Sequence, residues 1–316
     1  MAICFYHPEC ESHDPGSDHS ENVLRLHAIH EALISRLPAN VHLKEMPLGE
    51  ADIFKLAHDA DYVDFVFNAI PKEGRKEIEI NEVVSDHDGG EVTVLSPRSG
   101  DAILRCAGGI KASVDAVMSG NNVRAFCATR PPGHHALRNK AMGFCAFNNV
   151  AVAARYAQKA YSIGKIGIID FDVHHGNGTQ EIFAEDRNVI HACIHQLPLW
   201  PETGRESEVG CGNLLNVPVP PDSARDVWMS LWKDKIINRL DQEAPEIIFV
   251  SAGFDAHKLE PKAQQNLETE DYYTITQDIV RIAKKHAQGR IVSFLEGGYN
   301  VSALADSLLE HLRGLE

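Results

Sequence analysis

The chain alternates between short apolar runs rich in β-branched residues and longer stretches whose apolar residues recur at helical spacing. The runs expected to form strands are 3–7, 123–128, 166–169, 189–194, 247–251 and 291–295. The stretches expected to form helices are 21–37, 52–69, 100–117, 149–162, 222–242, 271–287 and 302–312. Strands that are apolar throughout are buried on both faces, so this order predicts an α/β fold, with a parallel sheet and helices on both of its faces.

A single domain is expected over residues 1–316. No Pro/Gly/Ser-rich linker, low-complexity tract, long charge run or internal repeat divides the sequence. A chain of 316 residues that is 44% hydrophobic can bury a large core.

The formal net charge is −15, and the acidic residues are spread along the whole sequence. Such a surface repels nucleic-acid phosphates and anionic membranes, so neither is expected as a partner. The seven cysteines include no CxxC pair, which favours reduced thiols over a disulfide framework. No apolar stretch approaches the roughly 20 residues that span a bilayer. These features together predict a cytoplasmic protein.

Four of the predicted strands run directly into polar clusters. The segments that follow them are Arg130–His135, Asp170–Gly176, Ala252–Asp255 and Glu296–Tyr299. In open parallel sheets, ligands bind at the carboxyl ends of the strands. We therefore expect these four segments, which are distant in sequence, to converge on one pocket.

Asp172, His174 and Asp255 are the candidate metal ligands. Residues i and i+2 of an extended backbone point to the same side, so Asp170, Asp172 and His174 can line one face. Two carboxylates and an imidazole leave positions open for water and substrate, as catalytic zinc requires. The same ligand types also suit Fe²⁺, Co²⁺ or Mn²⁺. For Asp172 and His174 taken alone, a capping or turn role is the plain alternative.

The tandem histidines His134 and His135 are the candidate acid–base groups. Two adjacent imidazoles near a metal cannot both carry a charge at low cost, so one is expected to act as a neutral base. Asp170 and Asn177, on a neighbouring segment, are available to orient them. A surface pair in a Pro-Gly turn is the alternative.

Tyr299 could donate its hydroxyl to a carbonyl oxygen as negative charge develops there. It follows the Gly297-Gly298 pair, and Gly297 is expected to line the substrate site. The aromatic residues Phe144 and Trp200 lie on predicted loops. They are either ordinary packing residues or the two walls of a narrow channel for an extended alkyl chain.

At these residues the chain resembles the superfamily of histone deacetylases and acetylpolyamine amidohydrolases, and its bacterial class II members in particular. Weaker similarity at residues 6–9 and 57–62 extends the resemblance over nearly the whole chain. The matching strings are RPPGHHA (130–136), MGFCAFNNVAVAA (142–154), DFDVHHGNGTQ (170–180), SAGFDAH (251–257) and EGGYN (296–300).

The resemblance implies an arginase-like α/β fold, one catalytic Zn²⁺ and hydrolysis of an N-acyl amine to a free amine and a carboxylate. It also implies a structural K⁺ near the Asp170–His174 loop, held partly by main-chain oxygens. The implied roles are metal ligand for Asp172, His174 and Asp255, general base and acid for His135, electrostatic partner held by Asp170 for His134, carbonyl polariser for Tyr299, channel wall for Phe144 and Trp200, and contact with the substrate amide for Gly143.

Several positions depart from the family pattern. Asn177 stands where class I enzymes carry aspartate, which leaves His135 with a neutral partner. Cys193 replaces the usual serine, which puts one side-chain K⁺ ligand in doubt. Trp200 is bulkier than the usual Phe or Tyr and narrows the expected channel. Lys262 lies near the expected mouth of the site, where polyamine-selective relatives can carry an acid.

The substrate expected first is therefore an acyl-lysine side chain or another small acylated amine, with an acetylpolyamine as the alternative. A non-catalytic protein that binds acylated ligands would have lost a ligand, a histidine or the tyrosine, and none is missing. A two-manganese ureohydrolase needs additional carboxylate ligands, and Val173 and the His134-His135 segment fit that pattern poorly. A homo-oligomer is possible, but no self-complementary patch is apparent in the sequence.

Overall fold

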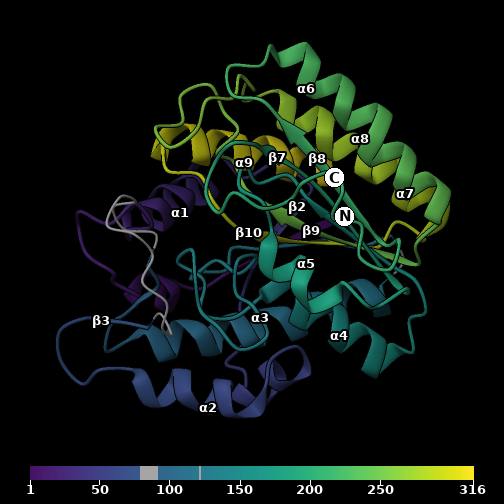
Figure 1. Ribbon diagram of the computed structural model, residues 1–316. Helices are drawn as coiled ribbons and strands as arrows, with labels where there is room; N and C mark the ends of the chain where they lie inside the picture. Colours follow the sequence, from purple (N-terminus) through teal and green to yellow (C-terminus); the bar gives the residue numbers. More distant parts are fainter. Residues whose placement is uncertain (79–91, 121) are drawn as a thin grey trace.

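The computed structural model describes residues 1–78, 92–120 and 122–316 (Figure 1). In this part of the chain the main feature is an eight-stranded sheet in which every neighbouring pair is parallel. In spatial order the strands are β2 (Val41–Glu45), β1 (Ala2–Tyr6), β5 (Arg124–Cys127), β10 (Ile291–Leu295), β9 (Ile247–Ala252), β6 (Ile166–Asp170), β7 (Val189–Gln196) and β8 (Leu214–Val219). A short antiparallel pair is formed by β3 (Lys76–Glu77) and β4 (Val94–Leu95).

Helices cover both faces of the sheet, as the sequence predicts (Figure 1). On one face, α3 and α4 pack against the central strands, with α2 outside them. On the other face lie α1, α6, α7, α8 and α9. The α-helices are α1 (Leu24–Arg36), α2 (Ala60–Ala69), α3 (Ser99–Ser119), α4 (Asn149–Tyr161), α5 (Asn177–Phe183), α6 (Arg225–Leu231), α7 (Asn238–Glu243), α8 (Asp271–His286) and α9 (Val301–Leu315).

Burial explains why the apolar pattern of the sequence indicated some strands and missed others. Every residue of β5, β6, β9 and β10 is buried, because helices cover both faces of the central sheet. The edge strand β2 exposes four of its five residues, and β8 carries Asn216 and Pro218 among its apolar residues. These two strands lack an unbroken apolar run, so the sequence pattern did not indicate them.

The helix expected over residues 52–69 is wrong at its middle. It is divided into a 3₁₀ segment, η2 (Ala51–Leu56), and α2, with Asp59 in an extended conformation between them. The reason is a long-range contact: the Asp59 N–H donates to the Arg138 oxygen at 3.1 Å, and His58 Nε2 accepts from the Asn148 N–H at 2.9 Å. Helical periodicity alone cannot reveal this.

The helix expected over residues 222–242 begins later and is not uniform. It runs as α6, a π-helical segment η3 (Trp232–Ile237) and α7. A further 3₁₀ segment, η1 (Pro8–Ser12), follows β1. Among the described residues, no helix combines the length and the apolar character that crossing a bilayer requires.

Because β5, β10, β9 and β6 are adjacent and parallel, their carboxyl ends lie along the same edge of the sheet. The loops that leave this edge carry the polar clusters that the sequence analysis singled out. The sheet therefore brings four segments from distant parts of the chain to one place.

Candidate active site

Asp172, His174 and Asp255 form a compact buried group, here called the catalytic cluster. His174 Nδ1 lies 3.0 Å from Asp172 Oδ1 and 3.2 Å from Asp255 Oδ2. One ligand atom from each residue lies within 4.8 Å of the others. Bonds of about 2.1 Å to a tetrahedral zinc ion would separate neighbouring donors by roughly 3.4 Å. The observed spacing and donor types therefore fit a divalent metal with open positions.

Backbone groups hold the two carboxylates of this cluster in place. Asp172 Oδ2 accepts from the Gly297 N–H at 2.8 Å, and Asp255 Oδ1 accepts from the Val173 N–H at 2.8 Å. A Cβ added at Gly253 or Gly297 would come within 2.1 or 2.2 Å of a carboxylate oxygen of the cluster. Gly297, expected to line the substrate site, thus lies directly against the candidate metal ligands.

The two histidines of the 130–136 segment have different partners. His134 Nδ1 donates to Asp170 Oδ2 at 3.0 Å, and His135 Nδ1 donates to Asn177 Oδ1 at 2.7 Å. Their rings are 3.9 Å apart, and His135 lies 6.0 Å from the His174 ring. Donation from Nδ1 leaves His135 Nε2 with a lone pair, as a base requires.

These partners divide the charge between the two imidazoles. Burial lowers the pKa of His134, but the charges of Asp170 and Asp172 outweigh this and raise it to about 10. Burial lowers the pKa of His135 well below its ordinary value, and the charges of His134 and His174 lower it further. These shifts in pKa favour a protonated His134 beside a neutral His135.

Glu296 holds the backbone of the histidine segment by hydrogen bonds, a role that the sequence analysis did not assign. Its Oε2 accepts from the N–H of Gly133 at 2.7 Å and of His134 at 3.1 Å. Its Oε1 accepts from Ser251 Oγ at 3.1 Å, so the residue joins β9 to this loop. Its place directly after β10 was visible in the sequence, but its target was not.

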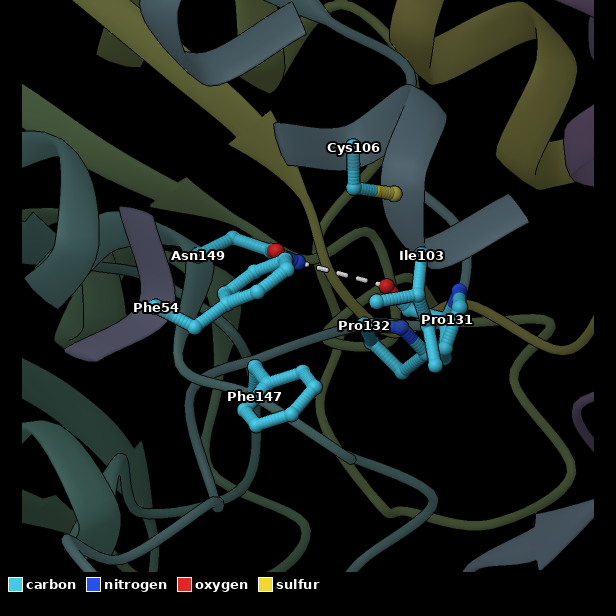
Figure 2. Close-up of a pocket in the computed structure, with 7 residues that line it drawn as sticks. All are labelled: Phe54, Ile103, Cys106, Pro131, Pro132, Phe147 and Asn149. Carbon is cyan, nitrogen blue, oxygen red and sulfur yellow. Dashed lines mark hydrogen bonds between the residues drawn. The ribbon is translucent and has the colours of Figure 1, made fainter. Parts of the chain in front are cut away.

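Packing behind the same loop is shown in Figure 2. Asn149 Nδ2 donates to the Pro131 oxygen at 3.2 Å, and aromatic rings of Phe54 and Phe147 stack at 4.2 Å beside it. The pocket between these groups measures about 10 Å³, which is the space of roughly one water. The side chains that line this pocket support the loop, and the pocket itself is too small to hold an organic substrate.

Aromatic side chains stand around His135. The Trp200 ring lies 4.7 Å from the His135 ring, and the Phe144 ring lies 6.0 Å from that of Tyr299. Gly143 has a φ of +57°, and a Cβ there would come within 2.4 Å of His135 Cδ2 and 2.7 Å of the Trp200 ring. Only glycine fits this close approach without displacing the His135 ring.

Tyr299 and Lys262 both lie close to the ring of Phe144. The Tyr299 N–H donates to Glu260 Oε2 at 2.9 Å, which fixes the backbone of the tyrosine. Lys262 Nζ lies 5.6 Å from the Phe144 ring centre and 5.8 Å from that of Tyr299. Phe144, Tyr299 and Lys262 thus lie beside one another. The structure also brings the three candidate metal ligands together with the other predicted residues, which are His134, His135, Asp170, Asn177, Gly143, Trp200 and Gly297.

The family model described as the histone deacetylase domain matches residues 19–315. The chain belongs to the histone deacetylase family. It is 36% identical to the type-2 histone deacetylase 2 of Dictyostelium discoideum over 99% of its own length, but it spans only 20% of that protein. It is 32% identical to the histone deacetylase-like amidohydrolase of Pseudomonas aeruginosa, covering 89% of this chain and 73% of that one.

The fold comparison agrees. The crystal structure of acetylpolyamine aminohydrolase from Burkholderia pseudomallei superimposes with a TM-score of 0.84 at 25% identity, covering 100% of this chain and 98% of that one. The predicted superfamily and the predicted α/β fold are both confirmed.

Proposed function

We propose that this chain is a zinc-dependent deacylase that hydrolyses an N-acyl amine to a free amine and a carboxylate. The observation that carries the proposal is the position of His135, a neutral imidazole at the catalytic cluster. Its nitrogen lone pair is kept available by donation from the other ring nitrogen to Asn177. A set of ligands for one metal ion, a neutral base and an adjacent cation are together the groups that amide hydrolysis needs.

Zinc held by Asp172, His174 and Asp255 would polarise the acyl carbonyl and lower the pKa of water. His135 takes the proton from the attacking water, since burial holds its pKa well below the ordinary value and favours the neutral imidazole. The Tyr299 hydroxyl donates to the carbonyl oxygen as negative charge develops there. His135 then gives its proton to the departing amine. His134, protonated beside Asp170, stabilises negative charge throughout.

The substrate we propose first is an acyl-lysine side chain or another small acylated amine. Phe144 and Trp200 would flank its alkyl chain, and Gly143 lies where a backbone group could meet its amide. Lys262 Nζ, less than 6 Å from both Phe144 and Tyr299, disfavours a second positive charge on the substrate nearby. We base the ranking of substrates on the lysine at this position rather than on the net charge of −15, because surface fields are screened within ~8 Å at physiological salt.

An acetylpolyamine is the second candidate, and the overall acidic charge favours it. Parallel assays with an acetyl-lysine peptide, acetylputrescine and acetylspermidine separate the two. We expect the highest kcat/KM for the acetyl-lysine peptide. A Lys262→Ala variant should gain activity on acetylspermidine, and a strong preference of the unaltered chain for polyamines would contradict the ranking.

The remaining alternatives differ in class. A non-catalytic binder would retain acylated ligands without turnover, and a ureohydrolase would release urea from a guanidinium substrate with manganese. A cytoplasmic location is consistent with the cysteines, all seven of which lie in described residues without a disulfide. We propose no nucleic-acid or membrane partner, and a homo-oligomer stays a prediction.

A further inference from the structure

His191, in β7, is a buried histidine with unmet hydrogen-bonding capacity. Its exposed fraction is 1%, and among the described residues neither Nδ1 nor Nε2 has a hydrogen-bond partner. A neutral imidazole carries one N–H and one lone pair, and leaving both unmet in a protein interior is costly. Such an orphaned group requires an explanation, and a bound ion is one.

The side chains of Cys193 and Asp170 lie close to that of His191. Cys193 is two residues further along β7 and so points to the same side of the sheet. Asp170, the last residue of β6, is the register partner of Cys193. One ligand atom from each of the three lies within 4.8 Å of the others, and all three residues are buried. We call Asp170, His191 and Cys193 the inner cluster.

Asp170 can take part without leaving His134. Its Oδ2 accepts from His134 Nδ1, and its Oδ1 accepts from the Asp172 N–H at 3.1 Å. Each carboxylate oxygen has two lone-pair directions, so capacity for another ligand remains.

The donor types decide which ion fits. Imidazole and thiolate suit zinc and related transition metals, whereas hard cations are bound by oxygen ligands. A potassium ion would gain little from a histidine and a cysteine. The serine that the family pattern has at position 193 would supply an oxygen, and this chain supplies sulfur instead.

We propose that the inner cluster binds a second transition-metal ion, zinc by its ligand set, through the Asp170 carboxylate, the His191 imidazole and the Cys193 thiolate. This ion takes the place of the potassium expected near the Asp170–His174 loop. It joins β6 to β7 and fixes Asp170 against His134. On binding, the S–H bond of Cys193 is replaced by a metal–sulfur bond. The released proton goes to the solvent, because burial lowers the pKa of His195, whose Nδ1 lies 3.3 Å from Sγ, to about 3, and this imidazole does not retain a proton at neutral pH.

Cobalt substitution of the full chain tests the proposal, because a thiolate bound to Co²⁺ gives a near-ultraviolet charge-transfer band. The catalytic cluster contains no sulfur, so that band reports on the inner cluster. We expect about two ions per chain and the band in the unaltered protein. Cys193→Ser should lose the band and about one ion, while Asp255→Asn should lose one ion and keep the band.

Cys211→Ser is the matched control, since Cys211 is the least buried cysteine and lies outside both clusters. It should retain both ions and the band. A single ion in the unaltered chain, a cobalt-loaded protein without the band, or a band that persists in Cys193→Ser would overturn the proposal. The first two outcomes concern the unaltered protein and hold even if a variant fails to fold. They do not depend on deacylase activity, so they leave the proposed function standing.

Discussion

The catalytic cluster and the inner cluster both begin at the end of β6, at Asp172 and Asp170, yet they differ in donors and in access. The catalytic cluster has two carboxylates and an imidazole, and the half-buried Trp200 ring lies 6.5 Å from the ring of His174. The inner cluster has one carboxylate, an imidazole and a thiol, and its buried residues lie within β7 and at the end of β6. On this account the end of β6 contributes to both a catalytic and a structural metal site. Access of substrate distinguishes the two sites.

Tyr299→Phe tests the catalytic side of this comparison most strongly. Removing the hydroxyl should lower kcat by about 10²–10³-fold, as for loss of an oxyanion donor. The metal content should stay unchanged, because the tyrosine belongs to neither cluster. Steady-state deacylation with metal analysis measures both quantities. Undiminished turnover would refute the role assigned to the hydroxyl.

Gly143→Ala sharpens the claim that access belongs to the catalytic cluster alone. The new Cβ would displace His135 or Trp200, and misplacement of a base by about 1 Å costs up to roughly 10²-fold in rate. Gly74→Ala is the control, since Gly74 has a similar φ of +69° and nothing within 4 Å of an added Cβ. Equal rate losses in the two variants would mean that backbone strain, not crowding of the site, is responsible.

Asn177→Asp tests how the partners set the charge on the histidine pair. A carboxylate beside Nδ1 favours the charged imidazole, so it raises the pKa of His135. Less neutral base is then present at low pH, and the acidic limb of the kcat/KM profile should move to higher pH. A profile with an unmoved acidic limb would argue that His135 is not the base.

His311 provides a test in the core beside the clusters, where its ring lies 5.9 Å from that of Phe171 and belongs to neither cluster. Burial lowers its pKa to about 3, and its ring contacts Thr276 Oγ1 at 2.6 Å and Ser293 Oγ at 3.0 Å. In the unfolded chain His311 takes up a proton near pH 6.5, whereas in the folded protein it stays neutral until about pH 3. The free energy of unfolding that depends on the neutral imidazole is therefore fully present above pH 6.5 and is lost as the pH falls toward 3.

The size of this effect follows from the two pKa values. Between pH 7 and pH 4.5 the loss amounts to about 2–3 kcal/mol. His311→Asn, measured by denaturant unfolding at both pH values, should show a correspondingly smaller dependence on pH while both metal sites keep their ions. An unchanged pH dependence would contradict the neutral state of His311.

The sequence revealed most of the sheet because its central strands are buried on both faces. It did not indicate β2 and β8, whose polar residues break the apolar pattern, or α5, which is short and starts inside the site segment. The break between η2 and α2 depends on contacts with residues 138 and 148, which are remote in sequence.

The candidate site was predictable where side chains directly follow strands, as for His134, Asp172 and Asp255. His191 was not, because it lies within an apolar strand and gains meaning only from Asp170 on the neighbouring strand. Glu296 and Gly253 were visible in their motifs, but their contacts with His134 and Asp172 required the fold.

Zinc dependence of deacylation is the most direct test of the account. Acetyl-lysine peptide hydrolysis should vanish when the protein is treated with a chelator and return when zinc is added. Asp255→Asn, folded by circular dichroism, should stay inactive at every zinc concentration. Full turnover by the chelated protein, or by Asp255→Asn, would contradict the claim that these three side chains hold the ion on which the reaction depends.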